Sequence, residues 1–292
     1  MTQLAVPAAT VPLPGRARLV RYGKIIAATA VLTYGFCLFL VYAIQSYAIF
    51  PGQLLRSYAP AFTAATGVQP ISLQTADGEH LFGYYSPPKP GSGIVVTFHG
   101  NGGFPEQHAV RFQNAAWAGK GWGFLCVTYR GYSRSSGQPS EAAALRDGDA
   151  VVAYAQAQAP GAPILFHGHS LGAAVATAMA ARHPNVGLYL EAPFVSMQAM
   201  ARLRFPIFPT DQLLHDTFRS DLRIKSVTSP IVIVHGRDDS IVPFASGEAL
   251  AAATEGRARF VALPGEHIEI FGKDDGVAEP FFRGQVTAAL AR

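Results

Sequence analysis

Charged residues are scarce in this chain of 292 residues, where they make up 14% against about 25% in an ordinary soluble protein. Cysteine is scarcer still: two residues exclude a disulfide framework and leave no zinc-binding spacing. Acidic residues are absent before Asp77, and four of the 23 basic residues precede residue 25. The other 19 basic residues balance 19 acidic ones, so the net charge of +4 does not indicate a nucleic-acid partner.

A long uncharged run follows these four basic residues. No charge lies between Lys24 and Arg56, and residues 25–44 read IIAATAVLTYGFCLFLVYAI. Twenty helical residues span about 30 Å, the thickness of the hydrocarbon core of a bilayer. The sequence therefore predicts a transmembrane helix over residues 25–48. The basic residues before it favour a cytoplasmic N-terminus (1–24) and a catalytic domain on the extracytoplasmic side, periplasmic in a bacterium.

This run has two other interpretations. A cleaved signal peptide remains an alternative, with the small-residue triplet 46–48 as its cleavage site. The apolar region is, however, longer than the usual 7–15 residues of a signal peptide. A buried core helix is disfavoured because no polar face interrupts the run. The membrane anchor is the favoured interpretation.

The rest of the chain alternates short apolar runs with helical segments, which is typical of an α/β fold with a mostly parallel sheet covered on both faces. We expect a linker over 49–67 and one domain over 68–292, with a small cap insertion at 193–229. Eight strands are expected at residues 68–73, 81–85, 93–98, 123–129, 164–167, 186–191, 231–235 and 259–263. Helices are expected at about 105–119, 140–158, 171–182, 244–253 and 279–291.

The strongest local motif is G-H-S-L-G at residues 168–172, which follows the apolar run ILFH and precedes AAVATAMAAR. Strand, G-x-S-x-G and helix in this order are typical of a nucleophile elbow. The flanking glycines allow a tight turn that exposes Ser170, and the following helix N-terminus can stabilise a developing oxyanion. An ordinary glycine-rich turn is the alternative, and the flanking strand and helix argue against it.

A serine nucleophile needs a base, and the base needs an acid to orient it. His267 is the only histidine after Asp239, which makes it the candidate base by elimination. Asp238 and Asp239 both follow the seventh predicted strand, and only one of them can face His267. Asp238, Asp239 and His267 all lie just past the ends of predicted strands, on the same sheet edge as Ser170.

An oxyanion hole needs two donors. One candidate is the backbone amide of Leu171. The other is the amide of Asn101, in the loop H-G-N-G-G that follows the third predicted strand. A phosphate-binding loop is disfavoured because no Lys-Ser/Thr pair follows these glycines.

Two further groups of side chains were considered. Phe205, Ile207 and Phe208 in the insertion are candidates either for plain cap packing or for an acyl pocket that meets the bilayer. His167 and His169 resemble a metal pair, but no third ligand lies nearby in sequence. We therefore predict no metal and no cofactor.

Taken together, these motifs resemble the α/β-hydrolase superfamily, in particular the single-pass, membrane-anchored proteins of the bud-emergence type, relatives of protein depalmitoylases. The resemblance runs from about residue 70 to 290 and rests on F-H-G-N, Y-R-G-Y-S-R-S-S-G-Q-P-S-E, G-H-S-L-G, E-A-P-F-V-S, H-G-R-D-D-S-I-V-P and G-E-H. It implies the α/β-hydrolase fold and places the catalytic acid at Asp239. Two positions differ from the family pattern. Gly102 stands where the family usually has a second asparagine, and Ser133 stands where it usually has glycine.

These observations predict a serine hydrolase that cleaves a small-molecule or lipidic ester or thioester through an acyl-enzyme on Ser170. A serine peptidase with the same triad and a non-catalytic binding protein of the same fold are the alternatives. Transfer of the acyl group to an alcohol instead of water is also compatible with the sequence. Oligomeric state is not predicted.

Overall fold

The structure is a computed structural model that describes residues 15–291, and these divide into two compact units between Ile44 and Gln45. The first unit consists of most of helix α1 (Arg16–Ile49). Within the described residues, α1 is the one helix long and apolar enough to cross a membrane, and its most apolar stretch has no buried residue. The predicted apolar helix is thus present. The first 14 residues of the predicted cytoplasmic segment lie outside the described residues.

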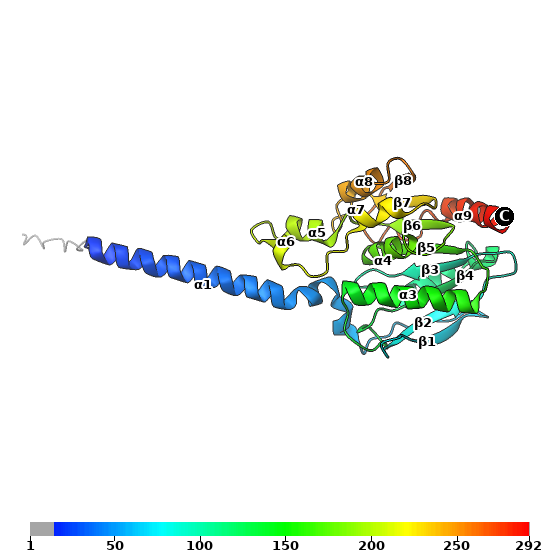
Figure 1. The fold of residues 1–292 in the computed structure, drawn as a ribbon, viewed down its shortest axis with the longest axis horizontal. Helices are drawn as coiled ribbons and strands as arrows, with labels where there is room; N and C mark the ends of the chain where they lie inside the picture. Colours follow the sequence, from blue (N-terminus) through cyan, green and yellow to red (C-terminus); the bar gives the residue numbers. More distant parts are fainter. Residues whose placement is uncertain (1–14, 292) are drawn as a thin grey trace, which may run out of the picture. The chain divides into compact units, whose positions relative to one another are not determined.

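The second unit is built on an eight-stranded sheet in the order β1-β2-β4-β3-β5-β6-β7-β8 (Figure 1). β1 and β2 form an antiparallel pair and β2 pairs antiparallel with β4, whereas all other neighbours are parallel. The strands are β1 (Gln69–Gln74), β2 (His80–Ser86), β3 (Ile94–Phe98), β4 (Gly123–Val127), β5 (Ile164–His169), β6 (Gly187–Glu191), β7 (Ile231–Gly236) and β8 (Ala258–Leu263). The predicted fold class and all eight strands are confirmed.

Successive side chains of the central strands enter two cores on opposite faces of the sheet. Val96 of β3 and Leu190 of β6 lie in one core, whereas Val95 and Tyr189 lie in the other. All four are buried. A parallel strand covered on both faces has no solvent-facing side, which explains why these strands read as continuous apolar runs in the sequence.

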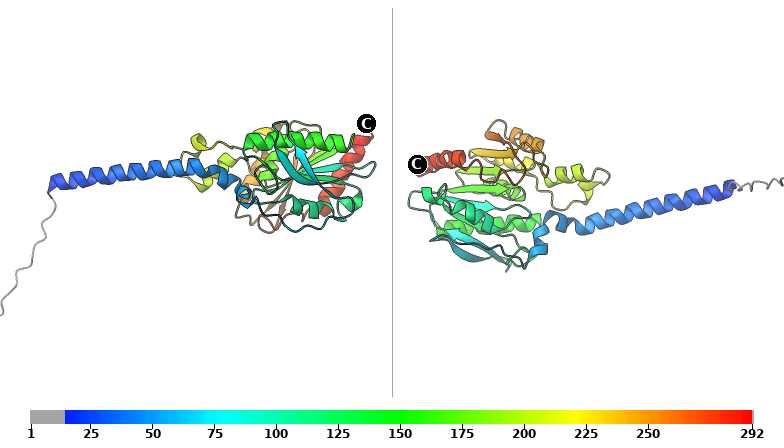
Figure 2. Two further views of the ribbon diagram at one scale, coloured as in Figure 1. Left: turned by 90° about the horizontal axis from the view of Figure 1, so that it is seen from below. Right: turned by 180° about the vertical axis from the view of Figure 1, so that it is seen from behind.

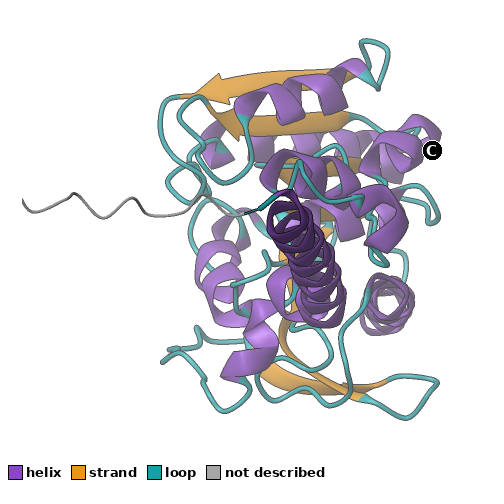
Figure 3. Ribbon diagram, turned by 90° about the vertical axis from the view of Figure 1, so that its left-hand side faces the viewer, coloured by secondary structure: helices purple, strands orange, loops and turns teal. Residues whose placement is uncertain are grey.

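Helices cover both faces of the sheet (Figures 2 and 3). The first core receives side chains from α3, α4 and α8, and the second from α2 and α9. The bounds of these helices are α2 (Pro105–Phe112), α3 (Glu141–Gln158), α4 (Leu171–Ala180), α8 (Phe244–Ala252) and α9 (Asp275–Leu290). Ser140 caps α3 by accepting from the Ala143 amide at 3.1 Å.

Two helix predictions were wrong at one end. The helix expected to reach residue 119 ends at Phe112, because the Asn114 side chain accepts from the amides of Ala116 and Trp117 at 2.8 and 3.3 Å. Such side-chain bonds compete with the helical pattern. The last helix begins at Asp275, four residues before the expected start, and tolerates Pro280 near its N-terminal end.

The long connection between β6 and β7 contains α5 (Met197–Arg204), α6 (Thr210–Leu213), α7 (Ser220–Arg223) and the 3₁₀ helix η3 (Ile224–Ser226). Two more 3₁₀ helices, η1 (Pro51–Leu55) and η2 (Ala118–Lys120), precede β1 and β4. Residues 193–229, predicted as a cap, thus contain short helices between the end of β6 and the start of β7, and their role as a cap stays a prediction.

Candidate active site

Ser170 occupies the sharp turn between β5 and α4 in a strained backbone conformation, with φ 54° and ψ −116°. A non-glycine residue with positive φ is uncommon and is stabilised only by its surroundings. Here the Ser170 amide donates to the Glu191 carbonyl at 2.9 Å, and the Ala173 amide donates to the Ser170 carbonyl at 3.0 Å. This is the geometry of a nucleophile elbow, in which the turn presents the serine hydroxyl at the carboxyl edge of the sheet.

The two glycines that flank the elbow are required by close backbone packing. A Cβ at Gly168 would overlap the carbonyl of Gly172, and a Cβ at Gly172 would overlap the carbonyl of Phe98. Helix α4 therefore lies directly against the ends of β5 and β3. This contact brings the N-terminus of α4, with its free amides, next to the loop that follows β3.

His267 and Asp239 form the central hydrogen-bonded pair of the site. The His267 Nδ1 lies 2.7 Å from the Asp239 Oδ2, and both side chains are buried. The other carboxylate oxygen accepts from the amides of Ile241 and Val242 at 2.9 and 2.8 Å. Since the carboxylate only accepts, Nδ1 carries the proton and Nε2 is the nitrogen left to accept one.

The electrostatics of Asp239 favour its charged form. Burial opposes ionisation, but hydrogen bonds from His235, His267 and the Val242 amide outweigh it and hold the pKa of Asp239 below its ordinary value. Asp238 points elsewhere, because its carboxylate accepts from the Gly265 amide at 3.0 Å. Of the two adjacent aspartates, Asp239 is therefore the one that contacts His267, as the resemblance implies.

His169 supports the backbone of His267, the candidate base. Its Nε2 donates to the His267 carbonyl at 3.2 Å, and the two rings lie 5.0 Å apart. Burial and the neighbouring His267 lower the pKa of His169 to about 4, so it is neutral near pH 7. Among the described residues, no hydrogen bond joins the Ser170 hydroxyl to His267. Such catalytic hydrogen bonds are often long before substrate binds and shorten in the complex.

Ser170, His169 and His267 line one cavity of about 770 Å³. Most of its other wall comes from the loop 100–103, one side of α2 and residues 268–272. Apolar side chains with large exposed fractions, those of Val110, Ile241 and Ile268, line it together with the polar Gln107 and Asn114. A cavity of this size can hold a drug-sized ligand.

Hydrogen bonds from His99 and from the Gly103 amide hold the loop after β3. Burial lowers the pKa of His99 to about 4, and its Nδ1–H donates to the Gly100 carbonyl at 2.7 Å. The Gly103 amide donates to the same oxygen at 3.0 Å. In a trans peptide the N–H points opposite to the carbonyl, so these bonds also set the direction of the Asn101 amide, the predicted oxyanion donor. The other predicted donor, the Leu171 amide, begins α4.

The candidate acyl-pocket residues lie elsewhere. Phe205, Ile207 and Phe208 do not line the cavity that contains Ser170. The rings of Phe205 and Phe208 lie 6.5 Å apart, and the side chain of Ile207 is 72% exposed. Their part in binding an acyl chain stays a prediction.

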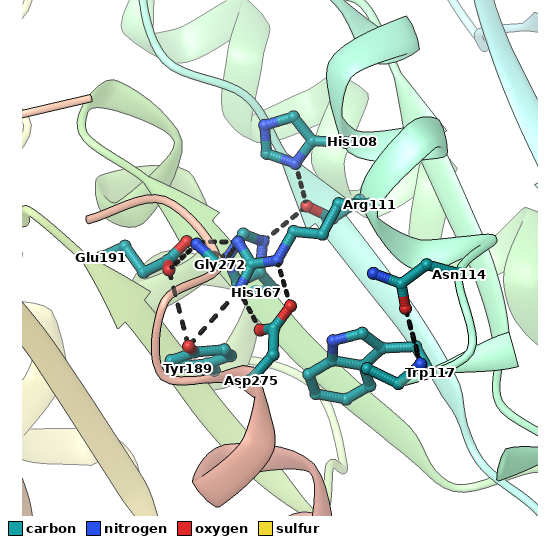
Figure 4. A network of polar contacts seen from close by, with 11 residues as sticks. His108, Arg111, Asn114, Trp117, His167, Tyr189, Glu191, Gly272 and Asp275 are labelled. Atoms are coloured by element: carbon teal, nitrogen blue, oxygen red, sulfur yellow. Dashed lines mark hydrogen bonds and ion pairs between the residues drawn. The ribbon is translucent and has the colours of Figure 1, made fainter. Parts of the chain in front are cut away.

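A buried polar network that the sequence did not predict lies beside the cavity (Figure 4). Arg111 of α2 forms ion pairs of 2.5 Å with Glu191 at the end of β6 and with Asp275 at the start of α9. Glu191 also contacts His167 Nε2 at 2.9 Å and accepts from the Gly272 amide at 2.8 Å. The network thus links α2 and two strands to the segment that follows His267.

The charge of Arg111 determines the ionisation of this network. Burial alone would raise the pKa of Glu191, but Arg111 and the hydrogen bond from His167 hold it below its ordinary value. The one sequence signal for this network is a glutamate at the end of an otherwise apolar strand, VGLYLE. His167 belongs to this network, and the described residues contain no group of three or more His, Cys, Asp or Glu side chains arranged to hold a metal ion.

Comparison with known proteins identifies the family of this chain. A family model described as serine aminopeptidase, S33, matches residues 89–221. The uncharacterized protein Rv2307c of Mycobacterium tuberculosis is 36% identical over 200 residues, which cover 67% of this chain and 70% of that one. This chain belongs to the α/β-hydrolase superfamily. The predicted superfamily is confirmed, whereas the finer likeness to bud-emergence-type proteins stays a prediction.

Two more proteins are similar to this α/β-hydrolase. The lysophosphatidylserine lipase ABHD12 of Xenopus tropicalis is 28% identical over 202 residues, which cover 63% of this chain and 52% of that one. Among solved structures, Est1E from Butyrivibrio proteoclasticus with bound ferulic acid has a TM-score of 0.61 and 22% identity, and the match covers 74% of this chain and 99% of that one. This structural match concerns the fold.

Proposed function

We propose that this α/β-hydrolase is a membrane-anchored serine hydrolase that cleaves carboxylic ester or thioester bonds of small-molecule or lipidic substrates. The observation that carries the proposal is the arrangement at the sheet edge. Ser170 in its strained turn and His267 paired with Asp239 at 2.7 Å open onto one cavity. The name of the lysophosphatidylserine lipase supports ester chemistry by similarity.

In the proposed reaction, Ser170 Oγ attacks the acyl carbon while His267 Nε2 takes its proton. Asp239 holds the imidazole in the required tautomer and stabilises the imidazolium that forms. The amides of Leu171 and Asn101 stabilise the negative charge on the carbonyl oxygen, a contribution of a few kcal/mol per donor, about 3 in measured cases. His267 then protonates the leaving group, and water activated by His267 releases the acid. The reaction needs no cofactor and no metal.

The proposed membrane arrangement rests on α1 and on the charges around it. Residues 1–24 would lie in the cytoplasm, residues 25–48 would span the membrane, and the hydrolase domain would lie outside the cytoplasm. Cleavage near residue 48 would instead release the domain. Intact-mass measurement of the membrane and soluble fractions separates the two: a membrane-bound chain of 31.0 kDa supports the anchor, and a soluble chain that lacks the first 48 residues refutes it.

The catalytic assignment is tested with a fluorophosphonate probe, which reacts with activated serines. We expect the wild-type protein to be labelled and Ser170→Ala not to be labelled. Ser72→Ala, which changes an exposed serine on the edge strand β1, is the matched control and should label like the wild type. Labelling that survives in Ser170→Ala contradicts the assignment.

Substrate class is tested separately with p-nitrophenyl esters of increasing acyl length, acyl thioesters and aminoacyl p-nitroanilides. Ester or thioester turnover that varies with chain length supports the proposal and the acyl-pocket role of the cap residues. The matched family model is described as an aminopeptidase, so anilide turnover without ester turnover would favour the peptidase alternative. A flat response to chain length would remove the acyl pocket at Phe205, Ile207 and Phe208.

A further inference from the structure

The segment that follows the apolar run of α1 is packed into the hydrolase domain. Phe50 is fully buried, and its ring lies 6.0 Å from that of Phe218 in the cap insertion. Gln53 is also buried and donates to the carbonyls of Ser46 and Phe50 at 3.1 and 3.0 Å. We name residues 49–58, which begin the predicted linker, the entry segment. These contacts make the entry segment part of the folded domain.

The entry segment approaches the active site at Gly52. A Cβ at Gly52 would overlap the ring of Tyr132, so the backbone packs directly on that ring and only glycine fits. Tyr132 is fully buried, and its hydroxyl donates to the Asn101 carbonyl at 2.9 Å. One side chain therefore connects the entry segment to the loop that carries the predicted oxyanion donor.

Tyr132 completes a set of bonds that orient three successive peptide groups of this loop. The Tyr129 hydroxyl donates to the His99 carbonyl at 2.7 Å, and His99 Nδ1 donates to the Gly100 carbonyl at 2.7 Å. The bond from Tyr132 to Asn101 fixes the next peptide group. The Asn101 amide belongs to the middle one of the three, so a rotation of either neighbouring peptide would change its direction.

A second contact of the entry segment lies at the end of the same loop. The ring of Tyr58 packs edge-on against that of Phe104 at 5.2 Å. Phe104 directly follows residues 100–103 and precedes α2. The entry segment thus contacts side chains at two places around the loop, behind Asn101 and at Phe104.

We propose that Tyr132 is a positioning residue for the oxyanion loop and that the entry segment, through Gly52, is a structural part of the active site. The inference rests on the proposed function, because it assigns a role in stabilising the oxyanion of that reaction. Tyr132 takes no part in bond making or proton transfer. It holds the Asn101 amide in the direction in which the oxyanion forms.

The test uses full-length protein and the variant Tyr132→Phe, which keeps the ring and removes the hydroxyl. An oxyanion donor that is removed costs about 100- to 1000-fold in kcat, and a donor that is only released from its support should cost less. We expect kcat for a p-nitrophenyl ester to fall about 10-fold with little change in KM. The affinity for a trifluoromethyl ketone, whose adduct with Ser170 places an oxyanion in the same position, should fall in parallel.

Tyr85→Phe is the matched control. Tyr85 is also buried, and its hydroxyl also donates to a backbone carbonyl, that of Gln158 at 3.2 Å, away from the loop. It should lower the melting temperature about as much as Tyr132→Phe while leaving kcat and inhibitor affinity unchanged. An equal loss of kcat in both variants would show a general effect of stability and would overturn the proposal.

Gly52→Ala tests the entry segment from the other side of the Tyr132 ring. We expect it to lower kcat and trifluoromethyl ketone affinity like Tyr132→Phe, and the double variant should lose no more than the larger single effect. Gly276→Ala, at a glycine with open space around its Cβ position, is the control. If Gly52→Ala does not fold, Tyr132→Phe decides alone.

The outcomes separate this inference from the proposed function. If Ser170→Ala abolishes turnover but Tyr132→Phe leaves kcat and inhibitor affinity unchanged, the positioning role is wrong and the hydrolase assignment stands. If Ser170→Ala retains full turnover, the hydrolase assignment itself fails.

Discussion

Replacing Asp239 by asparagine tests the protonation state on which the proposed reaction depends. Asparagine has the shape of aspartate, and its oxygen can still accept from the amides of Ile241 and Val242, which now lie at 2.9 and 2.8 Å from the carboxylate. Its NH2 group then faces His267 Nδ1. Two donors cannot share this position, so the neutral imidazole moves its proton to Nε2.

The expected loss of kcat follows from this change in the tautomer of His267. With a proton on Nε2, His267 cannot accept one from Ser170, and the nucleophile loses its base. The same substitution in a serine protease triad lowers kcat about 10⁴-fold. At about 1.4 kcal/mol per factor of ten, this corresponds to an increase of about 5 kcal/mol in the activation free energy. The variant should fold normally, because the amide bonds to residue 239 are kept.

The assay is steady-state hydrolysis of a p-nitrophenyl ester, with Asp238→Asn as the matched control. Asp238 is adjacent and carries the same charge, but it contacts the Gly265 amide and not His267. We expect Asp238→Asn to change kcat by no more than about threefold, since its effect on His267 acts through solvent-screened charge alone. Equal losses in the two variants, or full activity in Asp239→Asn, would show that Asp239 does not set the tautomer of His267.

Three further predictions concern stability. Gly172→Ala should unfold the protein or lower its melting temperature sharply, because the new Cβ overlaps the Phe98 carbonyl, whereas Gly276→Ala should not lower it. Arg111→Met should cost about 3–5 kcal/mol in chemical denaturation, because it leaves Glu191 buried without its partner. The pKa of Glu191 lies below its ordinary value of 4.5, so its ionised form stabilises the protein above pH 4.5, and this stabilisation is lost as the pH falls further. Glu191→Gln should therefore flatten the acid side of a plot of stability against pH. An unchanged acid side would contradict this.

The features that the sequence predicted correctly are local. Each central strand is a short apolar run, and the turn at Ser170 is specified by five consecutive residues between a strand and a helix. The early end of α2 was missed because it depends on one side chain, that of Asn114, which bonds to backbone amides two and three residues ahead. Hydrophobic periodicity does not report such a bond.

The features that were missed join residues far apart in the chain. Arg111 and Asp275 are 164 positions apart, and their pairing depends on the packing of α2 against the start of α9. The packing of Gly52 on the Tyr132 ring is of the same kind. Each of these contacts involves one residue at each end, so no repeating sequence pattern marks it. Nothing near Arg111 or Gly52 in the sequence identifies the residue that it contacts. The cavity wall formed by α2 was likewise not predicted, since it depends on how the helix packs over the loop after β3.

Trapping the acyl-enzyme tests whether Ser170 is the nucleophile. Protein is mixed with an excess of a p-nitrophenyl ester, quenched in acid within the first turnover and digested, and the peptides are analysed by mass spectrometry. We expect one acyl group per chain, on the peptide that contains Ser170, and none in Ser170→Ala. An acyl group on another residue, or steady turnover with no covalent adduct and no initial burst of p-nitrophenol, would contradict it.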